Sequence, residues 1–216
     1  MEYYIHHIPL FVVDEISDSV SVPELCQEIE NLIPQESLFS NVDIFYIGNF
    51  KELKNHNAAF SNGAIYISNK ESTNADLIED IVHELAHSLE QAYSGHIYSD
   101  EFINEFKSKR RALKRILDSE GYKINSMFYD YTEYNKKFDD FLSNKVGYPK
   151  LLNLTRGLFA SPYGATSIQE YFANGFEKYV LDNPSSVGRK YVLDNPSTVE
   201  QISPVLYRKI QEIIDA

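Results

Sequence analysis

The feature that most constrains this chain is a pair of histidines four residues apart within a periodic segment. His83 and His87 belong to the run His-Glu-Leu-Ala-His. Apolar residues recur around them at helical spacing, at Leu77, Ile78, Ile81, Val82, Leu85 and Leu89. Ser72 and Thr73 are suitable N-cap residues, and the helix is expected to end near Gly95. Because residues four apart share a helix face, the segment predicts an amphipathic helix with both imidazoles on its polar side.

This spacing is typical of zinc-binding helices. Zn²⁺ binds histidine nitrogen at about 2.0–2.1 Å, takes three protein ligands in catalytic sites, and lowers the pKa of a bound water to about 7. Glu84 lies beside the first histidine, where its carboxylate would accept a proton from such a water. The alternative is an amphipathic helix that carries two histidines by coincidence. We expect His83 and His87 to bind one zinc ion per chain.

A third ligand has to come from elsewhere in the chain. The extended pattern with a third histidine would require glycine and histidine where this sequence has Glu90 and Tyr93, and His96 lies three residues too late. A carboxylate from a later helix is another known solution, and Glu170 is the best candidate. Ser167 and Glu170 also match a helix capping box, in which the carboxylate would bond to the cap amide instead. From these residues alone, both roles of Glu170 remain open.

Glu170 belongs to a second motif, Tyr-Gly-x-Thr-x-x-x-Glu-Tyr-Phe-Ala-x-x-Phe, which begins at Tyr163. The two motifs together resemble the catalytic domain of the anthrax lethal factor-like zinc metalloproteases, a family that also includes the Pro-Pro endopeptidases. The resemblance covers residues 40–215. It includes the Gly-Ala-Ile-Tyr strand before the histidine helix, an Asn-Pro and a Pro-x-x-Tyr-x-x-Ile tail.

The resemblance implies a role for each residue of the site. His83, His87 and Glu170 would bind zinc, Glu84 would be the general base, and Tyr163 would donate a hydrogen bond to the developing oxyanion. A phenol hydroxyl suits that role, although core packing is the alternative in a chain with 16 tyrosines. The sequence departs from the family at Asn174, where an acid is more usual. An asparagine here would accept a hydrogen bond from a ligand histidine less strongly than an acid does.

The same resemblance implies that residues 63–68 form the edge strand that binds substrate. Free N–H and C=O groups on such a strand pair with an extended peptide. The alternative is an ordinary strand of the sheet. The expected partner is therefore a peptide or protein substrate.

Composition limits the other partners. The chain has 20 Lys plus Arg and 32 Asp plus Glu, a net charge of −12, which repels phosphate backbones and anionic lipid. We therefore expect no nucleic-acid partner, and apolar runs are too short for a membrane span. The lone Cys26 excludes an internal disulfide and predicts a small core residue. A monomer is assumed.

The remaining segments predict an α+β fold in a single domain, and the resemblance implies that this fold is zincin-like. An α/β subdomain is expected over residues 1–95, with strands at 3–13, 42–47 and 63–68, a helix at 23–33, and a loop at 55–63. A mainly helical subdomain is expected over residues 96–216, with helices at 100–119, 167–180 and 204–214. The basic cluster from Lys107 to Arg115 is expected to be a solvated helix face. A 12-residue duplication spans residues 178–199 and is expected to add surface structure.

These expectations favour a zinc-dependent endopeptidase, and the family resemblance implies a secreted or toxin-like protease. The first 13 residues show no secretion-signal pattern, so a cytoplasmic location remains open. One alternative is an intracellular regulatory protease that cleaves a repressor-type protein. Another is a catalytically silent binding module of the same fold.

Overall fold

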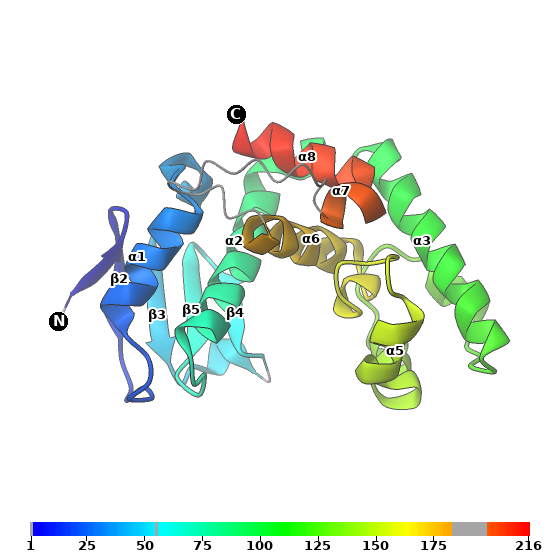
Figure 1. Ribbon diagram of the computed structural model, residues 1–216, viewed down its shortest axis with the longest axis horizontal. Helices are drawn as coiled ribbons and strands as arrows, with labels where there is room; N and C mark the ends of the chain where they lie inside the picture. The colour runs from blue at the N-terminus through cyan, green and yellow to red at the C-terminus, as the bar shows by residue number, and fades with distance from the viewer. Residues whose placement is uncertain (1, 55, 183–197) are drawn as a thin grey trace. The chain divides into compact units, whose positions relative to one another are not determined.

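The computed structural model describes residues 2–54, 56–182 and 198–216 (Figure 1). The chain is α+β, as predicted, with a small mixed sheet in its N-terminal part and helices over most of the rest. Contacts divide it into two units, one formed mainly by Met1–Ala92 and the other by Tyr93–Tyr179 with the two C-terminal helices. The described residues include no helix that is both long and apolar enough to cross a membrane. Most of the duplication lies outside the described residues.

The first unit is built around a five-stranded sheet with the order β1-β2-β3-β5-β4. Its strands are β1 (Tyr3–Ile5), β2 (Ile8–Val12), β3 (Ile44–Gly48), β4 (Ala58–Ser61) and β5 (Ala64–Ser68). The central strands β2, β3 and β5 are parallel, and the outer strands β1 and β4 are antiparallel to their neighbours. The sheet is therefore mixed, with an antiparallel strand at each edge.

The prediction of one continuous strand over residues 3–13 is wrong, because a tight turn at His6 and His7 divides it into β1 and β2. His6 has a φ of 54°. Its backbone N–H donates to Glu30 Oε1 at 2.6 Å, and its ring Nε2 lies 2.9 Å from the carbonyl oxygen of Ile33. Two-residue hairpin turns usually carry glycine or asparagine, so this turn has no local sequence signal.

The prediction of a loop over residues 55–63 is wrong in part, because this segment contains a strand. The strand is β4, which pairs with β5 across a turn at Asn62 and Gly63. These two residues have φ values of 51° and 78°, as a two-residue hairpin turn requires, so the predicted turn is confirmed. A Cβ atom on Gly63 would lie only 2.4 Å from Asp43 Oδ2. The strand was missed because its alanines have little intrinsic strand preference.

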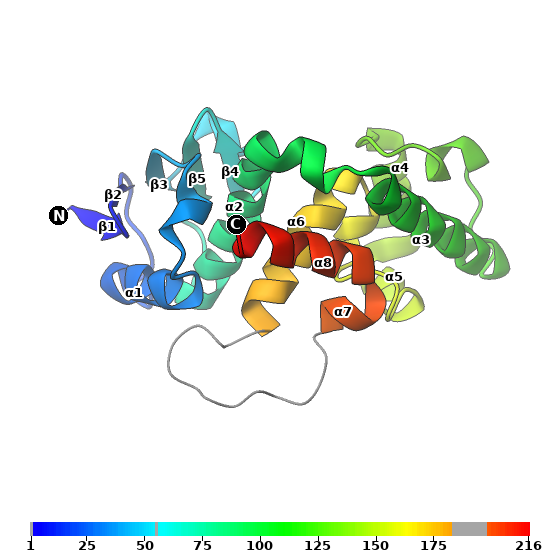
Figure 2. The ribbon, with the colours of Figure 1, turned by 90° about the horizontal axis from the view of Figure 1, so that it is seen from above.

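Two helices, α1 (Val22–Leu32) and α2 (Asn74–Ile97), cover one face of this sheet (Figures 1 and 2). Alternate strand residues face them and form the core of the unit: Leu10, Phe45, Ile47, Ile65 and Ile67. Cys26 on α1 is also buried, and burial raises the pKa of its thiol to about 11. The prediction of a core cysteine is therefore confirmed.

The second unit is helical. Its longer helices are α3 (Asp100–Ser119), α6 (Ile168–Asp182) and α8 (Pro204–Ile214). Shorter elements are η3 (Ser126–Tyr129), α4 (Lys136–Asp140), the π-helix η4 (Phe141–Gly147), α5 (Tyr148–Leu154), η5 (Tyr163–Ala165) and α7 (Thr198–Ile202). The three predicted long helices are confirmed, as is the succession of short elements between them.

The prediction that the basic cluster of α3 is a solvated face is wrong for two of its members. Lys109 is 7% exposed and Arg110 is 1% exposed. The Arg110 guanidinium donates to the carbonyl oxygens of Phe128, Ala165 and Thr166. The Lys109 ammonium donates to the carbonyl oxygens of Leu158 and Ile202. Both cations thus satisfy buried carbonyls of the segments that cross α3.

Replacing Arg110 with methionine is expected to lower the free energy of unfolding by about 3 kcal/mol or more, because three buried carbonyl oxygens lose a charged donor. The measurement is urea unfolding followed by circular dichroism. Arg111→Met is the matched control, since Arg111 is exposed and its replacement should change the free energy by less than about 0.5 kcal/mol. Equal effects of the two substitutions would contradict a structural role for Arg110.

Candidate metal centre

The helix that carries the histidine motif is fixed at its N-terminus by side-chain hydrogen bonds. Thr73 Oγ1 accepts from the N–H of Asp76 at 3.2 Å, which caps the helix, and donates to the Asp76 carboxylate at 2.7 Å. The Asn74 side chain accepts from the N–H of Ser21 and donates to its carbonyl oxygen. The start of α2 is therefore tied to the start of α1, as well as capped where the sequence predicts.

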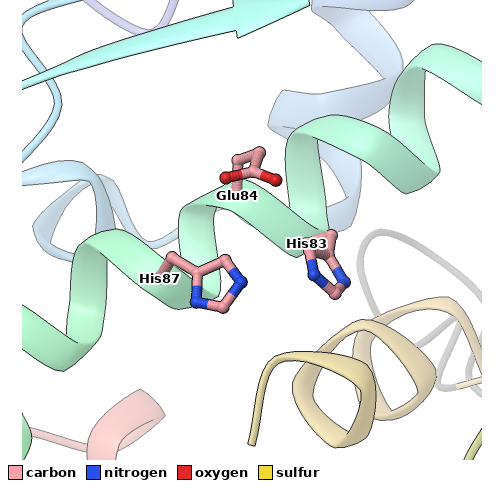
Figure 3. Close-up of side chains that lie close together, drawn as sticks. All are labelled: His83, Glu84 and His87. Atoms are coloured by element: carbon pink, nitrogen blue, oxygen red, sulfur yellow. The ribbon is translucent and has the colours of Figure 1, made fainter. Parts of the chain in front are cut away.

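The two sides of α2 differ as predicted. Its apolar side is buried against the sheet, through Leu77, Ile78, Ile81, Val82, Leu85, Ala86 and Leu89. His83, Glu84 and His87 are partly exposed, and Figure 3 shows the two imidazoles one turn apart on the same side of the helix. The helix thus presents three polar side chains from a rigid, well-packed element.

These three side chains form the one group of three or more potential metal ligands found among the described residues. One ligand atom from each of His83, Glu84 and His87 lies within 4.8 Å of the others. The imidazole ring centres are 5.0 Å apart with an angle of 74° between the planes. Two imidazoles so placed suit a catalytic zinc ion, which takes three protein ligands, and the Glu84 carboxylate lies beside them.

An acidic side chain lies beside one of the histidines. Glu90 Oε2 lies 3.6 Å from Nδ1 of His87, one helical turn further along. A carboxylate beside one ring nitrogen favours the other nitrogen as the metal ligand and raises its basicity. Glu90 occupies a position where the extended motif has glycine. Its i+3 spacing from His87 is the sequence signal from which this contact could have been predicted.

The carboxylate of Glu84 is held by the backbone of the neighbouring strand. Glu84 Oε2 accepts a hydrogen bond from the N–H of Phe60 on β4 at 2.6 Å. Such a charge-assisted bond is short and directional, so it fixes the carboxylate beside the strand. Sequence reasoning missed Phe60 because its contribution is a backbone group, which no residue pattern reports.

The edge strand of the sheet differs from the prediction. Residues 63–68 contain β5, which lies between β3 and β4, so the predicted edge strand is an interior strand and the edge next to Glu84 is β4. The N–H of Ser68 donates to the carbonyl oxygen of Asn57, and hydrogen-bonded pairs alternate along an antiparallel ladder. The N–H and C=O groups of Ala58 and Phe60 therefore point away from β5.

Glu170 lies in the second unit, in the first turn of α6. The N–H of Glu170 donates to Ser167 Oγ at 3.1 Å, so half of the predicted capping box is present. One carboxylate oxygen of Glu170 is buried. The predicted role of Glu170 as a zinc ligand stays a prediction.

Tyr163 is carried by η5, which packs directly on the first two turns of α6. The Cβ position of Gly164 would lie 3.6 Å from the Glu170 carbonyl oxygen. Asn174 is buried, and its side chain donates to that carbonyl oxygen at 2.8 Å. It also accepts a hydrogen bond from Ser161 Oγ. Ser161 Oγ in turn accepts a 3.4 Å hydrogen bond from the N–H of Gly164. Asn174 thus links the Tyr163 loop to Glu170. The sequence offers no local signal for this link.

The other histidines have different contacts. His96 Nε2 lies 2.8 Å from the Glu212 carboxylate, on the surface of the second unit. His6 and His7 lie near Glu36, at 3.8 and 3.5 Å. None of these histidines belongs to a metal-binding group of three side chains among the described residues.

Comparisons with models of known protein families, with curated proteins and with solved structures give no match.

Proposed function

We propose that this chain is a zinc-dependent endopeptidase with a zincin-like catalytic domain. The observation that carries the proposal is the cluster of His83, Glu84 and His87 on a capped, buried helix beside the edge strand of a sheet. Histidines at i and i+4 with an adjacent glutamate suit metal-assisted hydrolysis, in which two side chains hold the ion and the third moves protons.

Zinc, when bound, would polarise the peptide carbonyl and make water a stronger nucleophile. Glu84 would accept a proton from the attacking water and return it to the departing amine, as a general base and then a general acid. The Phe60 N–H would keep the Glu84 carboxylate in place during both transfers. Tyr163 would donate a hydrogen bond to the carbonyl oxygen as its negative charge develops.

His83 and His87 would hold the metal, and Glu170 would be the third protein ligand. Two nitrogens and one carboxylate are a common catalytic zinc set. The packing of η5 on α6 supports this assignment, because it brings the segments that carry Tyr163 and Glu170 together within one unit.

The substrate would bind as an extended peptide that adds a strand to β4. Ala58 offers an N–H and a C=O at the edge, and Phe60 offers a C=O, whereas the Phe60 N–H is engaged by Glu84. Backbone pairing of this kind accepts many sequences and leaves selectivity to side-chain contacts. The proposed substrates are therefore proteins with an exposed, extended segment, outside or inside the cell.

The proposal is tested with a peptide library incubated with the purified chain. We expect cleavage that a metal chelator abolishes and added zinc restores. Cleavage that resists chelation would contradict a metal-dependent mechanism. Zinc binding without cleavage of any library member, or of any unfolded protein, would favour a binding module of this architecture instead.

A further inference from the structure

A half-buried carboxylate in the second unit accepts hydrogen bonds from two tyrosine hydroxyls. Asp139 on α4 accepts from the hydroxyl of Tyr148 through Oδ1 at 2.7 Å and from the hydroxyl of Tyr134 through Oδ2 at 2.8 Å. Each oxygen of the carboxylate therefore anchors one ring. Phenol donors to an ionised acceptor make strong, directional hydrogen bonds, so both rings are held at their outer ends.

Tyr148 stands at a break in the backbone. The π-helix η4 ends at Gly147, which has a φ of 85°, and α5 begins at Tyr148. Only glycine adopts such a φ without strain, and π-helical turns are frequent near functional sites. Tyr148 thus follows directly after the break, and the bond to Asp139 fixes the far end of its side chain.

The ring held in this way contacts Tyr163. The ring centres of Tyr148 and Tyr163 lie 6.2 Å apart at an angle of 86°, an edge-to-face contact. Burial, and then the hydrogen bond to Asp139, raise the pKa of Tyr148 well above its ordinary value. The Tyr148 hydroxyl therefore stays a donor to Asp139 across the whole neutral range.

The backbone of Tyr163 is fixed independently of its ring. Its carbonyl oxygen accepts from the N–H and the hydroxyl of Thr166, at 2.9 and 2.8 Å. The adjacent Gly164 packs on α6 near Glu170. Because the backbone is fixed, the rotation of the Tyr163 side chain determines where its phenol hydroxyl lies. A small rotation about the side-chain bonds moves that hydroxyl by a large distance, because it is the atom furthest from the backbone.

We propose that Tyr148, anchored by Asp139, is a positioning residue that holds the Tyr163 ring in its productive orientation. This inference rests on the proposed function, in which Tyr163 donates to the oxyanion. An oxyanion donor acts in the transition state, so misplacing it lowers kcat and leaves KM nearly unchanged. Tyr148 acts through Tyr163 and has no contact with substrate in this account.

The test is a double-mutant cycle with the full chain and a cleaved peptide from the library. Tyr163→Phe is expected to lower kcat by about a hundredfold. Tyr148→Phe keeps the ring but frees it from Asp139, and is expected to lower kcat by about tenfold with KM within about twofold. In the Tyr163→Phe background, Tyr148→Phe should cause no further loss, because the hydroxyl that it positions is already absent.

Tyr122→Phe is the matched control, because it removes the same hydroxyl group from another tyrosine near α5. The Lys150 ammonium of α5 lies 4.7 Å from the centre of the Tyr122 ring. Tyr122→Phe should leave kcat unchanged. Thermal unfolding of each variant shows whether it is folded, and Asp139→Asn provides a second way to weaken the same anchor if Tyr148→Phe unfolds.

Each outcome separates the inference from the proposed function. Independent, multiplying losses from Tyr148→Phe and Tyr163→Phe would overturn the positioning role, as would full activity of Tyr148→Phe. In either case, activity that still depends on Glu84 would leave the proposed function standing. A wild-type chain no more active than Glu84→Ala would overturn both.

Discussion

Glu84→Ala is expected to abolish detectable peptide hydrolysis while the chain still binds zinc. The carboxylate is the only group of the cluster assigned to proton transfer, and loss of a general base typically costs about a hundred- to ten-thousand-fold in rate. The two histidines keep their place on α2, because the helix is held by its buried side and its cap rather than by Glu84. Initial rates with a library-derived peptide measure the loss. A variant with wild-type kcat would end the proposed mechanism.

A backbone variant tests whether the Glu84 carboxylate has to be held by β4. Phe60→Pro removes the N–H that donates to Glu84, and the ladder to β5 is kept because that N–H points to the sheet edge. We expect kcat to fall by about tenfold. Phe60→Ala retains the N–H and controls for the lost ring. An equal loss in Phe60→Ala would assign the effect to the side chain instead.

His83→Ala and His87→Ala are each expected to remove both zinc binding and activity. Either change leaves one nitrogen where the metal needs two, so the remaining donors bind too weakly for a catalytic site. A ligand that binds only the folded chain stabilises it, by about 2.7 kcal/mol at a hundred times its dissociation constant. Added zinc should therefore raise the unfolding temperature of the wild type and of Glu84→Ala, and leave both histidine variants unchanged. His96→Ala, a surface histidine paired with Glu212, is the control.

The centre of the site could be predicted from sequence because its information is local. His83, Glu84 and His87 need only a helix, and the periodic apolar residues with the cap at Thr73 specify that helix. The long helices of the second half were predictable for the same reason. Helical spacing and caps depend on residues within a few turns of one another.

The features that sequence reasoning missed depend on partners distant in the chain. β4 is a strand because it pairs with β5 and its alanines carry little preference of their own. Lys109 and Arg110 resemble solvated cations in a charge count, yet they are buried because other segments present carbonyl oxygens to them. The Phe60 amide is a backbone group, so no residue type encodes its bond to Glu84.

The most direct test of the central claim is the zinc content of the purified chain, measured by elemental analysis after reconstitution. The account predicts one zinc per chain in the wild type and in Glu84→Ala, and none in His83→Ala or Glu170→Ala. Zinc retained in Glu170→Ala would restrict Glu170 to the cap of α6 and require another third ligand. A wild-type chain that binds no zinc would contradict the account as a whole.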